Sequence, residues 1–437
     1  MTIVGLDDTD SRTRGMCSTY AAARLADRVR DVGGRVERLL LVRLNPAVEH
    51  KTRGNAALAV HCDLPVDQAF ELATELVDEV AETADDRTNP GVVATGDDLG
   101  ARPEWLAALP RRAIREILDP EIDVRAPLVD GGYRHRGWGN GRGLVGASAA
   151  AGAWAGLGEL ESGPVASPVD WTYERLTYRE RDRWGSDREV DRDAVFEVAN
   201  EYYPRIWDTV DRGEGEAVCV PNTPGPVLYG IRGDDRAAVE AAAEAIESEP
   251  VARAVTFVTN QGTDQHLQTV EPGEIEANRA VRVTGEVIED PETREGGHVF
   301  ATLGFPDGEE GSLPCVAFEP TKRFRDRVRA LRAGDRVTAC GEVSDGTLKL
   351  EKFAVRDLRR TEPATPECPD CGRRMESAGA DAGYRCRDCR TSADGKVERP
   401  IERDLEAGWY EVPPCARRHI AKPLVRGGFD AATHPER

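Results

Sequence analysis

Lysine is scarce in this sequence of 437 residues. Lysines stand at positions 51, 322, 349, 352, 396 and 422 alone, so 52 of the 58 basic residues are arginines. Acidic residues number 79, and the formal charge is −21. An excess of acid with so little lysine is typical of proteins from salt-loving archaea. At molar salt the Debye length is about 3 Å, so this charge does not exclude a nucleic-acid partner, although binding would depend on stacking, shape and close contacts.

Long apolar runs and a signal-peptide pattern are also missing, which predicts a cytoplasmic protein with no membrane partner. Disulfides are not expected. Four of the ten cysteines form two Cys-x-x-Cys pairs, and the other six are scattered at positions 17, 62, 219, 315, 340 and 415. This distribution favours one metal site in a reducing compartment. The length predicts roughly three domains, and no obligate protein partner is expected.

The first 155 residues alternate between strand-like and helix-like patterns, which predicts an α/β domain. The expected elements span 2–6, 18–32, 36–44, 56–62, 66–82, 91–95 and 103–117. Residues 156–275 predict a compact α+β domain of the ferredoxin-like type. Its expected helices span 192–203 and 235–248, and its expected strands span 171–178, 216–220, 227–232 and 253–259.

Residues 278–358 predict five strands with a helix at 321–331 between the third and the fourth, which is the order of an OB-fold. OB-folds often bind single-stranded nucleic acid. A small β-barrel with another binding role is the alternative. A Pro-rich linker is expected at 362–366, a separate segment with the paired cysteines at 365–392, and a basic tail at 393–437.

A cluster of acids follows the first expected strand. Asp7, Asp8 and Asp10 come within four positions, and Ser18 then opens a helical pattern. Clustered carboxylates repel one another unless they hold a cation, and oxygen ligands suit Mg²⁺. The N-terminus of the following helix favours an anion. These residues predict a site for a nucleotide phosphate and Mg²⁺, whereas the alternative is a polar turn with a Ser or Thr helix cap.

Two further segments fit a phosphate site. Lys51 is the one lysine in the first 321 positions, and its compact charge suits a phosphate, with Arg53 and Asn55 beside it. The alternative is a chance surface lysine. The glycine-rich run 131–143 can let its backbone approach an anion, and we expect Gly139, Gly141, Arg142 and Gly143 to contact a nucleotide. This run lacks the Gly-Lys-Ser/Thr end of a P-loop, and a merely flexible loop is the alternative.

The paired cysteines are the strongest local motif. Cys368 and Cys371 are separated by fourteen residues from Cys386 and Cys389. Four thiolates in two such pairs predict a closed, tetrahedral and therefore structural Zn²⁺ site. Two redox-active pairs are the alternative, but no thioredoxin-like pattern surrounds them.

Two segments are candidates for contact with RNA. Asn260, Gln261 and Thr263 lie in a loop rich in amides and hydroxyls, which can read base edges, although a solvated loop is the alternative. The segment 412–428 has no acid and carries Arg417, Arg418 and Lys422, which predicts phosphate contact. Packing of this arm on the protein's own acidic surface is the alternative.

Several motifs together resemble the archaeal tRNA(Ile) 2-agmatinylcytidine synthetase (agmatidine synthase) family. They are Gly5-Leu6-Asp7-Asp8-Thr9-Asp10-Ser11, Arg14-Gly15-Met16-Cys17, Lys51-Thr52-Arg53-Gly54-Asn55, Gly141-Arg142-Gly143-Leu144-Val145-Gly146-Ala147 and Thr259-Asn260-Gln261-Gly262-Thr263-Asp264. The resemblance covers nearly the whole chain. It implies a kinase-like catalytic domain, a ferredoxin-like domain, an OB-fold and a zinc ribbon.

The resemblance also implies a reaction. Such enzymes use ATP to phosphorylate the C2 carbonyl oxygen of the wobble cytidine in isoleucine tRNA with a CAU anticodon. The amine of agmatine then displaces the phosphate, ATP ends as AMP and two phosphates, and the tRNA decodes AUA. Asp7, Asp8, Asp10, Ser18 and Lys51 would be catalytic. Thr9, Ser11, Arg53 and Asn55 would bind ATP with the glycine loop. In the family a threonine near the start of the first helix is autophosphorylated, and this chain has Ser18 there, with Thr19 as its neighbour.

Two other functions fit parts of the sequence. A non-catalytic protein that binds single-stranded nucleic acid would explain the OB-fold and the zinc ribbon, but not residues 1–150. An ATP-dependent kinase for a small molecule would leave the OB-fold and the ribbon without a role. The carboxylate that would bind agmatine cannot be chosen from the sequence.

Overall fold

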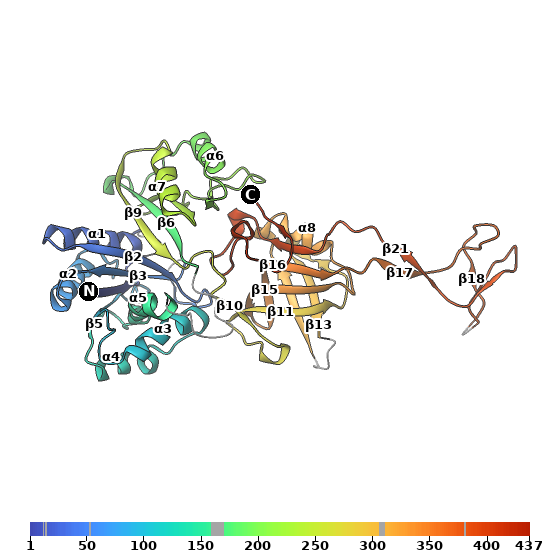
Figure 1. Ribbon diagram of the computed structural model, residues 1–437, viewed down its shortest axis with the longest axis horizontal. Helices are drawn as coiled ribbons and strands as arrows, with labels where there is room; N and C mark the ends of the chain where they lie inside the picture. Colours follow the sequence, from blue (N-terminus) through green and yellow to red (C-terminus); the bar gives the residue numbers. More distant parts are fainter. Residues whose placement is uncertain (12, 14, 52–53, 159–169, 306–310, 380–381) are drawn as a thin grey trace.

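The computed structural model describes residues 1–11, 13, 15–51, 54–158, 170–305, 311–379 and 382–437. Two packed α-and-β units lie at one end of the molecule, a β-barrel lies in the middle, and a narrow arm carries the cysteine-rich segment away from the barrel (Figure 1). Among the described residues no helix is both long enough and apolar enough to cross a membrane.

The first unit is an antiparallel sheet between two pairs of helices. Its strands are β1 (Thr2–Asp7), β2 (Val36–Arg43), β3 (Ala56–Cys62), β4 (Gly91–Gly96) and β5 (Arg134–Gly137), in the order β5-β4-β1-β3-β2. Its helices are α1 (Ser18–Asp31), α2 (Val66–Val80), α3 (Pro103–Arg115), the π-helix η1 (Pro120–Arg125), α4 (Ala126–Asp130) and α5 (Gly143–Gly158). The seven elements expected between residues 2 and 117 are all present, with bounds that shift by at most two residues.

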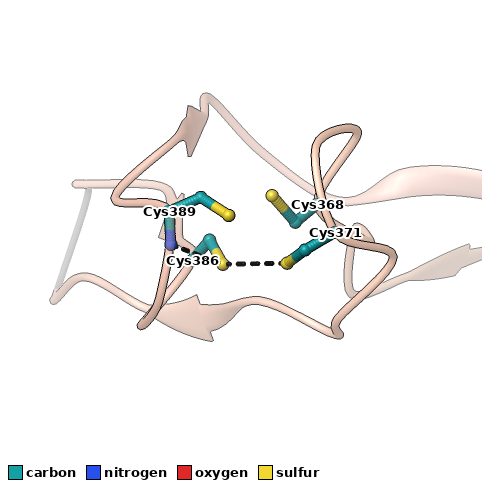
Figure 2. A group of neighbouring side chains, drawn as sticks. All are labelled: Cys368, Cys371, Cys386 and Cys389. Atoms are coloured by element: carbon teal, nitrogen blue, oxygen red, sulfur yellow. Dashed lines mark hydrogen bonds between the residues drawn. The ribbon is translucent and has the colours of Figure 1, made fainter.

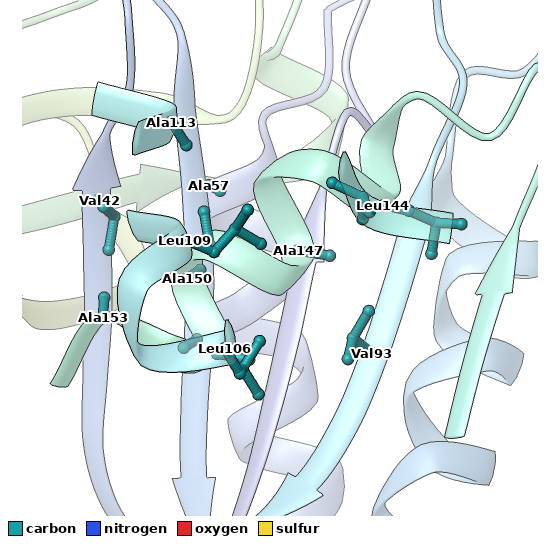
Figure 3. Close-up of a cluster of buried hydrophobic side chains, with 14 of the residues drawn as sticks. Val42, Ala57, Val93, Leu106, Leu109, Ala113, Leu144, Ala147, Ala150 and Ala153 are labelled. Carbon is teal, nitrogen blue, oxygen red and sulfur yellow. The ribbon is translucent and has the colours of Figure 1, made fainter. Parts of the chain in front are cut away.

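Alternating side chains send the two faces of this sheet into two cores, because successive residues of a strand point to opposite sides. Val4, Leu39 and Leu41 pack with α1 and α2. Ile3, Leu40 and Val42 pack with α3 and α5. Alanines of α5 and leucines of α3 fill the second core (Figure 3).

The second unit continues the same sheet. Its strands are β6 (Thr172–Arg179), β7 (Ile206–Trp207), β8 (Val227–Gly233) and β9 (Val251–Thr259), in the order β9-β6-β8-β7, and its helices are α6 (Arg192–Glu201) and α7 (Arg236–Ala245). β9 pairs in parallel with β2 through Leu40–Val258 and Leu41–Thr259. The two units therefore share one nine-stranded sheet.

The strand expected at 216–220 is wrong. These residues form turns, and one isolated bridge joins Asp211 to Glu216. The Cys219 N–H donates to the Thr209 carbonyl at 3.0 Å, while the Cys219 carbonyl accepts from the Gly230 N–H at 2.9 Å. These bonds are isolated and do not repeat along the segment, so no continuous ladder forms. The short strand β7 was not expected.

The barrel contains five strands: β11 (Ala280–Val287), β13 (Val299–Gly304), β14 (Ser312–Ala317), β15 (Arg336–Ser344) and β16 (Thr347–Asp357). Each strand pairs with the next in the closed order β11-β13-β14-β16-β15-β11. α8 (Phe324–Arg329) lies between the third and the fourth strand in the sequence, inside the expected helix. The five-stranded barrel predicted from the sequence is confirmed.

The C-terminal segments extend the barrel and form the arm. The arm contains β17 (Thr361–Ala364), β18 (Glu376–Ser377), β19 (Tyr384–Arg385), β20 (Ser392–Ala393) and β21 (Val397–Pro400). β17 overlaps the expected linker at residues 362–364 and pairs with β21, so that part of the linker is a strand. β22 (Gly408–Glu411) pairs with β16, and β23 (Thr433–His434) pairs with β22, so much of the expected tail folds onto the barrel.

The remaining elements of the described residues are two short strands and six 3-10 helices. They are β10 (Leu267–Thr269), β12 (Glu292–Thr293) and the 3-10 helices η2 (Arg181–Arg183), η3 (Pro272–Glu274), η4 (Glu295–Gly297), η5 (Glu319–Thr321), η6 (Pro414–Ala416) and η7 (Leu424–Arg426).

Candidate active site

The acid cluster lies at the end of β1 and opens into a cavity of about 470 Å³. Asp7, Asp8 and Asp10 line this cavity together with Lys51 and Arg142. Asn55 and Gly143 of the expected ATP-binding residues also line it. We call it the acid cavity. The structure thus brings together the acid cluster, the isolated lysine and the end of the glycine loop, which are up to 136 residues apart in the sequence.

Close packing of α5 on β1 fixes the position of Asp7. A Cβ atom added to Gly146 would lie 1.9 Å from Asp7 Oδ2, and one added to Gly5 would lie 1.9 Å from the Ala147 carbonyl oxygen. Only glycine permits these approaches, because no side-chain carbon fits in either place. The first turn of α5 consequently lies at the wall of the acid cavity, where the positive end of the helix dipole favours an anion.

Burial and repulsion between neighbouring carboxylates disfavour charge on Asp7 and Asp8. Burial, followed by the neighbouring charge of Asp8, raises the pKa of Asp7 well above its usual value. Burial also raises the pKa of Asp8 to about 7, and the charge of Asp10 adds to this effect, while a hydrogen bond from the Asn89 N–H and the charge of Arg142 oppose it. Such carboxyl groups are poised to exchange protons for a cation.

Asn89 was missed by the sequence analysis. Its N–H donates to Asp8 Oδ2 at 2.9 Å, and its side-chain oxygen accepts from the Asn140 N–H at 3.0 Å. Asn89 therefore connects the acid cluster to the glycine loop. The Asn-Pro-Gly sequence at 89–91, just before a strand, is a turn signal, but it carries no sign of this connection.

Other predicted residues support the cluster from outside the acid cavity. Gly139 and Gly141 do not line it, and both have positive φ angles, of 57° and 73°, in the glycine loop. Thr9 and Ser11 are fully buried, and Ser11 Oγ donates to Asp85 Oδ2 at 2.6 Å. Arg53 lies outside the described residues.

Lys51 is held at the rim of the acid cavity. Its ammonium group donates to the Val48 carbonyl oxygen at 3.2 Å and to that of Pro46. The Asn55 side chain donates to the Asn45 carbonyl oxygen at 2.8 Å. These bonds join described residues within the segment that connects β2 to β3.

A second cavity, of about 340 Å³, lies on the other side of Asp10. Ser18, Thr19, Arg43, Glu174 and Arg232 line it, and Asp10, Gly54 and Ala56 line both cavities. We call it the inter-unit cavity, because its walls come from both units of the shared sheet.

Ser18 is the first residue of α1, and Cys17 is the N-cap. The Ser18 hydroxyl accepts from the Thr9 N–H at 3.3 Å and lies 3.0 Å from the Thr9 hydroxyl. Its oxygen is therefore held beside the acid loop, and Ser18 is not the helix cap that the alternative interpretation required.

Two arginines surround one carboxylate in the inter-unit cavity. Arg232 Nε lies 3.1 Å from Glu174 Oε1, and Arg43 Nη2 lies 3.4 Å from Glu174 Oε2. Burial opposes ionisation of Glu174, but the two arginines outweigh it and lower its pKa. Arg43, Arg232 and Glu174 together carry one net positive charge.

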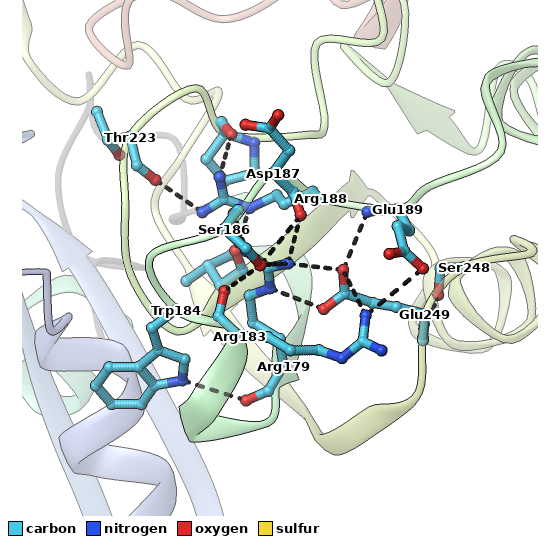
Figure 4. Close-up of polar contacts among 12 residues, drawn as sticks. Arg179, Arg183, Trp184, Ser186, Asp187, Arg188, Glu189, Thr223, Ser248 and Glu249 are labelled. Carbon is cyan, nitrogen blue, oxygen red and sulfur yellow. Dashed lines mark hydrogen bonds and ion pairs between the residues drawn. The ribbon is translucent and has the colours of Figure 1, made fainter.

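A buried network in the second unit holds one wall of the inter-unit cavity (Figure 4). Arg179 and Glu249 pair at 2.7 Å, and both side chains are fully buried. Arg188 donates to the carbonyl oxygens of Pro221, Thr223 and Val227 at 2.7–2.8 Å. Pro221, Thr223 and Val227 line the inter-unit cavity, so the bonds from Arg188 hold this part of its wall in place. The sequence offered no signal for either arginine.

The loop that contains Asn260, Gln261 and Thr263 is buried rather than solvated. The exposed fractions of these residues are 0%, 6% and 4%. The Asn260 side chain accepts from the Arg43 N–H at 2.7 Å and donates to the Arg43 carbonyl oxygen at 3.1 Å. It therefore completes the joint between β2 and β9. These side chains offer little surface to a base in this conformation, and their contact with tRNA stays a prediction.

The basic C-terminal segment packs on acids of its own chain. Arg417, with a side chain 5% exposed, pairs with Asp208 and with Glu411 at 2.8 Å. Arg418 pairs with Glu351 and with Glu342 at 2.8 Å. Lys422 pairs with Asp170 at 3.3 Å. These contacts are those of the alternative interpretation, and the predicted phosphate contacts are untested.

The four paired cysteines meet at the end of the arm (Figure 2). One sulfur atom from each of Cys368, Cys371, Cys386 and Cys389 lies within 4.8 Å of the others. Four sulfurs this close fit the donor set of a tetrahedral metal site.

Comparison with known proteins identifies the family. Family models match residues 3–134 (TiaS TCKD domain), 141–266 (TiaS FLD domain) and 365–405 (TiaS C-terminal zinc ribbon domain). The TiaS of Haloquadratum walsbyi, a 2-agmatinylcytidine synthetase for isoleucine tRNA, is 50% identical over 483 aligned residues, and the match covers 100% of each chain. The chain belongs to the TiaS family.

Solved TiaS structures have the same fold. The complex of TiaS with isoleucine tRNA and ATP matches with a TM-score of 0.86 and 40% identity over 100% of this chain and 99% of that one. The complex of TiaS with isoleucine tRNA, AMPCPP and agmatine matches with a TM-score of 0.84 and 38% identity, with the same coverage. The TiaS of Archaeoglobus fulgidus is 43% identical over 97% of each chain. The resemblance found in the sequence is confirmed.

Proposed function

We propose that this chain is a ligase that uses ATP to conjugate agmatine to the wobble cytidine of isoleucine tRNA with a CAU anticodon. The observation that carries the proposal is the full-length match to TiaS proteins, including structures described as complexes with isoleucine tRNA, ATP and agmatine. The alternative, a non-catalytic protein that binds single-stranded nucleic acid, is not favoured, because it assigns no role to the acid cavity.

The acid cavity is the proposed nucleotide site. Its donor set supports Mg²⁺, since Asp7, Asp8 and Asp10 supply oxygen ligands and Mg²⁺ commonly bridges carboxylates and phosphates. When bound, Mg²⁺ would neutralise phosphate charge. Lys51, Arg142 and the first turn of α5 would hold the phosphates, with Asn55 and the glycine loop beside them. Thr9 and Ser11 would support the acid loop. The sequence alone assigns Arg53 to the same phosphates.

The chemistry requires a better leaving group than the cytosine carbonyl oxygen. Transfer of a phosphoryl group to that oxygen supplies one, and such a transfer depends on positioning and charge stabilisation. The agmatine amine then forms the new C–N bond at C2, the C–O bond breaks, and phosphate leaves while the amine loses a proton. Ser18 lines the inter-unit cavity and is the proposed acceptor of the second phosphoryl group, which would pass from ADP to the Ser18 hydroxyl with loss of its proton. Water would then release this phosphate, so that ATP ends as AMP and two phosphates.

The finer fold assignments also belong to this proposal. The second unit runs β6-α6-β7-β8-α7-β9, and its strand order β9-β6-β8-β7 is the 4-1-3-2 order of a ferredoxin-like sheet. We assign residues 1–155 to a kinase-like domain, 156–275 to this ferredoxin-like domain, 278–358 to an OB-fold and 365–392 to the ribbon. Such an enzyme would work in the cytoplasm.

Zinc in the ribbon is tested separately from the reaction. Four thiolates would hold about one Zn²⁺ per chain. Metal analysis of the purified protein should find it, and Cys371→Ser should lower the zinc content. A purified wild-type chain without zinc would contradict the assignment.

The reaction is tested by mass. The protein is incubated with ATP, Mg²⁺, agmatine and the tRNA, and the anticodon fragment is weighed. We expect the mass gain of agmatine less one water. Asp8→Ala should abolish the gain while tRNA binding persists. An unchanged mass with the wild-type chain, beside an active TiaS from another archaeon, would refute the proposal.

A further inference from the structure

One segment between α2 and β4 holds both loops that meet at the acid cavity. It spans residues 82–89, and we call it the clamp segment. Its bonds reach each position of residues 8–11, the acid loop. They run from the Asn89 N–H to Asp8 Oδ2 at 2.9 Å, from the Glu82 N–H to the Thr9 carbonyl oxygen at 3.1 Å, from Thr88 Oγ1 to the Asp10 carbonyl oxygen at 2.7 Å and from Ser11 Oγ to Asp85 Oδ2 at 2.6 Å.

The acid loop needs this support because its backbone is not relaxed. Asp8 has a φ of 57°, in the left-handed region that few residues other than glycine adopt. Such a conformation persists when the surrounding structure over-determines it, and it is common where side chains must be held for function. The clamp segment supplies that determination at every position of the acid loop.

The clamp segment also seats the glycine loop, through Asn89 alone. Asn89 Oδ1 accepts from the Asn140 N–H at 3.0 Å, and the Asn89 carbonyl oxygen accepts from the Gly143 N–H at 2.9 Å. A Cβ atom added to Gly139 would lie 2.3 Å from Asn89 Oδ1, so the loop packs directly against this amide. The loop can take this seat because residue 139 is a glycine with positive φ.

Asn140 passes this position on to the wall of the acid cavity. Its side-chain oxygen accepts from the Arg142 N–H at 3.0 Å, and Arg142 lines the cavity. Asn89 therefore contacts the Asp8 carboxylate on one side and is two hydrogen bonds from Arg142 on the other. Asn89 itself is 6% exposed and does not line the cavity, so it acts through the two loops.

We propose that Asn89 is a positioning residue for the nucleotide, whose amide oxygen holds the glycine loop and Arg142 at a fixed place opposite Asp8. This inference rests on the proposed function for the identity of the nucleotide. A loop that is already in place loses less entropy when a ligand binds, so Asn89 should act on nucleotide affinity. Affinity for tRNA and for agmatine should not depend on it.

Asn89→Ala removes the side-chain bond to Asn140 and keeps the backbone bonds to Asp8 and Gly143. The probe is AMPPNP with Mg²⁺, a nucleotide whose γ-phosphoryl group is not transferred. Its binding to the whole chain, saturated with tRNA and without agmatine, is measured by calorimetry in molar KCl. We expect affinity to fall about five- to tenfold, because one hydrogen bond that holds the loop is lost. Asn200→Ala, at an exposed asparagine of α6, is the matched control and should keep wild-type affinity.

Gly139→Ala gives a second test that does not depend on one variant. The new Cβ meets Asn89 Oδ1, so binding of AMPPNP should weaken at least about tenfold. In the double variant that oxygen is absent, and the nearest remaining atom of residue 89 is Cβ, 3.6 Å away. The double variant should therefore bind no worse than Gly139→Ala alone, whereas two independent sites would give losses that multiply.

Wild-type affinity for AMPPNP in Asn89→Ala, or losses that multiply in the double variant, would overturn the assignment. A matching loss of tRNA affinity in Asn89→Ala, measured without nucleotide, would also overturn it, because a general disturbance of the fold lowers both. In steady state the KM for ATP should rise about five- to tenfold, while kcat and the KM for agmatine stay within about twofold. A wild-type chain that shows the expected AMPPNP binding and non-additivity but forms no agmatinylated product would refute the proposed function and leave the role of Asn89 standing.

Discussion

Neutralising Asp8 should stabilise the protein in the absence of metal and abolish its activity. Asn is a close match at this position. It keeps an oxygen that can accept the Asn89 N–H, and it tolerates the positive φ of 57° that residue 8 adopts. The substitution therefore removes the charge and little else. Any change in stability then reports the cost of placing that charge in the acid cluster.

The magnitude follows from the pKa of Asp8, which rises from 3.8 to about 7, chiefly through burial. Below pH 4 the group is protonated in both the folded and the unfolded state. Between pH 4 and 7 only the unfolded state loses the proton, so the wild type loses stability as the pH rises. A rise of about three pKa units corresponds to at most ~4 kcal/mol in the free energy of unfolding, and above pH 7 the wild type has lost all of it. Asp8→Asn escapes this loss.

Unfolding at molar KCl is followed at pH 5 and pH 8, with and without Mg²⁺. At pH 8 without Mg²⁺ we expect Asp8→Asn to unfold about 5–10 °C above the wild type, and at pH 5 the gap should shrink. Mg²⁺ should raise the wild-type midpoint, because a bound cation offsets the repulsion among the ionised carboxylates. Its effect on the variant should be smaller, because the variant has one carboxylate fewer. Asp86→Asn, an exposed acid in the next loop, is the control. An equal gap at both pH values, or no effect of Mg²⁺ on the wild type, would refute the reasoning.

Three other changes test the site and the joint. Gly146→Ala forces a carbon to within 1.9 Å of Asp7 Oδ2, so product formation measured by mass should fall at least a hundredfold, whereas Gly185→Ala, with open space around it, should keep wild-type activity. Ser18→Ala should lose both phosphorylation of the protein on incubation with ATP and product formation, and Ser18→Thr should keep both; a fully active Ser18→Ala would remove Ser18 from the mechanism. Asn260→Ala should destabilise the first two units by about 1–3 kcal/mol in urea unfolding, because the Arg43 N–H and carbonyl lose a buried partner, and an unchanged midpoint would mean that solvent replaces the side chain.

Local patterns predicted most of the individual elements. The helical patterns of α1 and α2 and the Cys-x-x-Cys spacing are each decided by a few neighbouring residues. Both helices have bounds within two residues of those expected, and the four cysteines meet in the structure. The acid cluster of the candidate site was predicted for the same reason. Asp7, Asp8 and Asp10 lie within four positions of the sequence, so they stay close together whatever the rest of the chain does.

Contacts between distant segments were not predictable in this way. Asn260 was singled out for its chemistry, but its amide completes a joint with Arg43, 217 positions away. Arg417 looked like a free cation, but Asp208 and Glu411 neutralise it in the interior. A single sequence shows the donors without showing their partners. In a chain with so many arginines and acids, each cation has many possible partners, and the fold selects among them.

The parallel pairing of β2 with β9 explains why two cavities meet at the acid cluster. Without that joint, the walls supplied by Glu174 and Arg232 would lie on a separate unit, and Ser18 would face solvent. The joint places Asp10 between a cavity rich in carboxylates and a cavity with net positive charge. Oxygen ligands attract a cation to one side of Asp10, and guanidinium groups attract an anion to the other. In the proposed reaction, a phosphoryl group that leaves the acid cavity would therefore move toward favourable charge. Asp10, Gly54 and Ala56 line both cavities, so bulk added at Ala56 should block the proposed transfer while leaving both cavities in place.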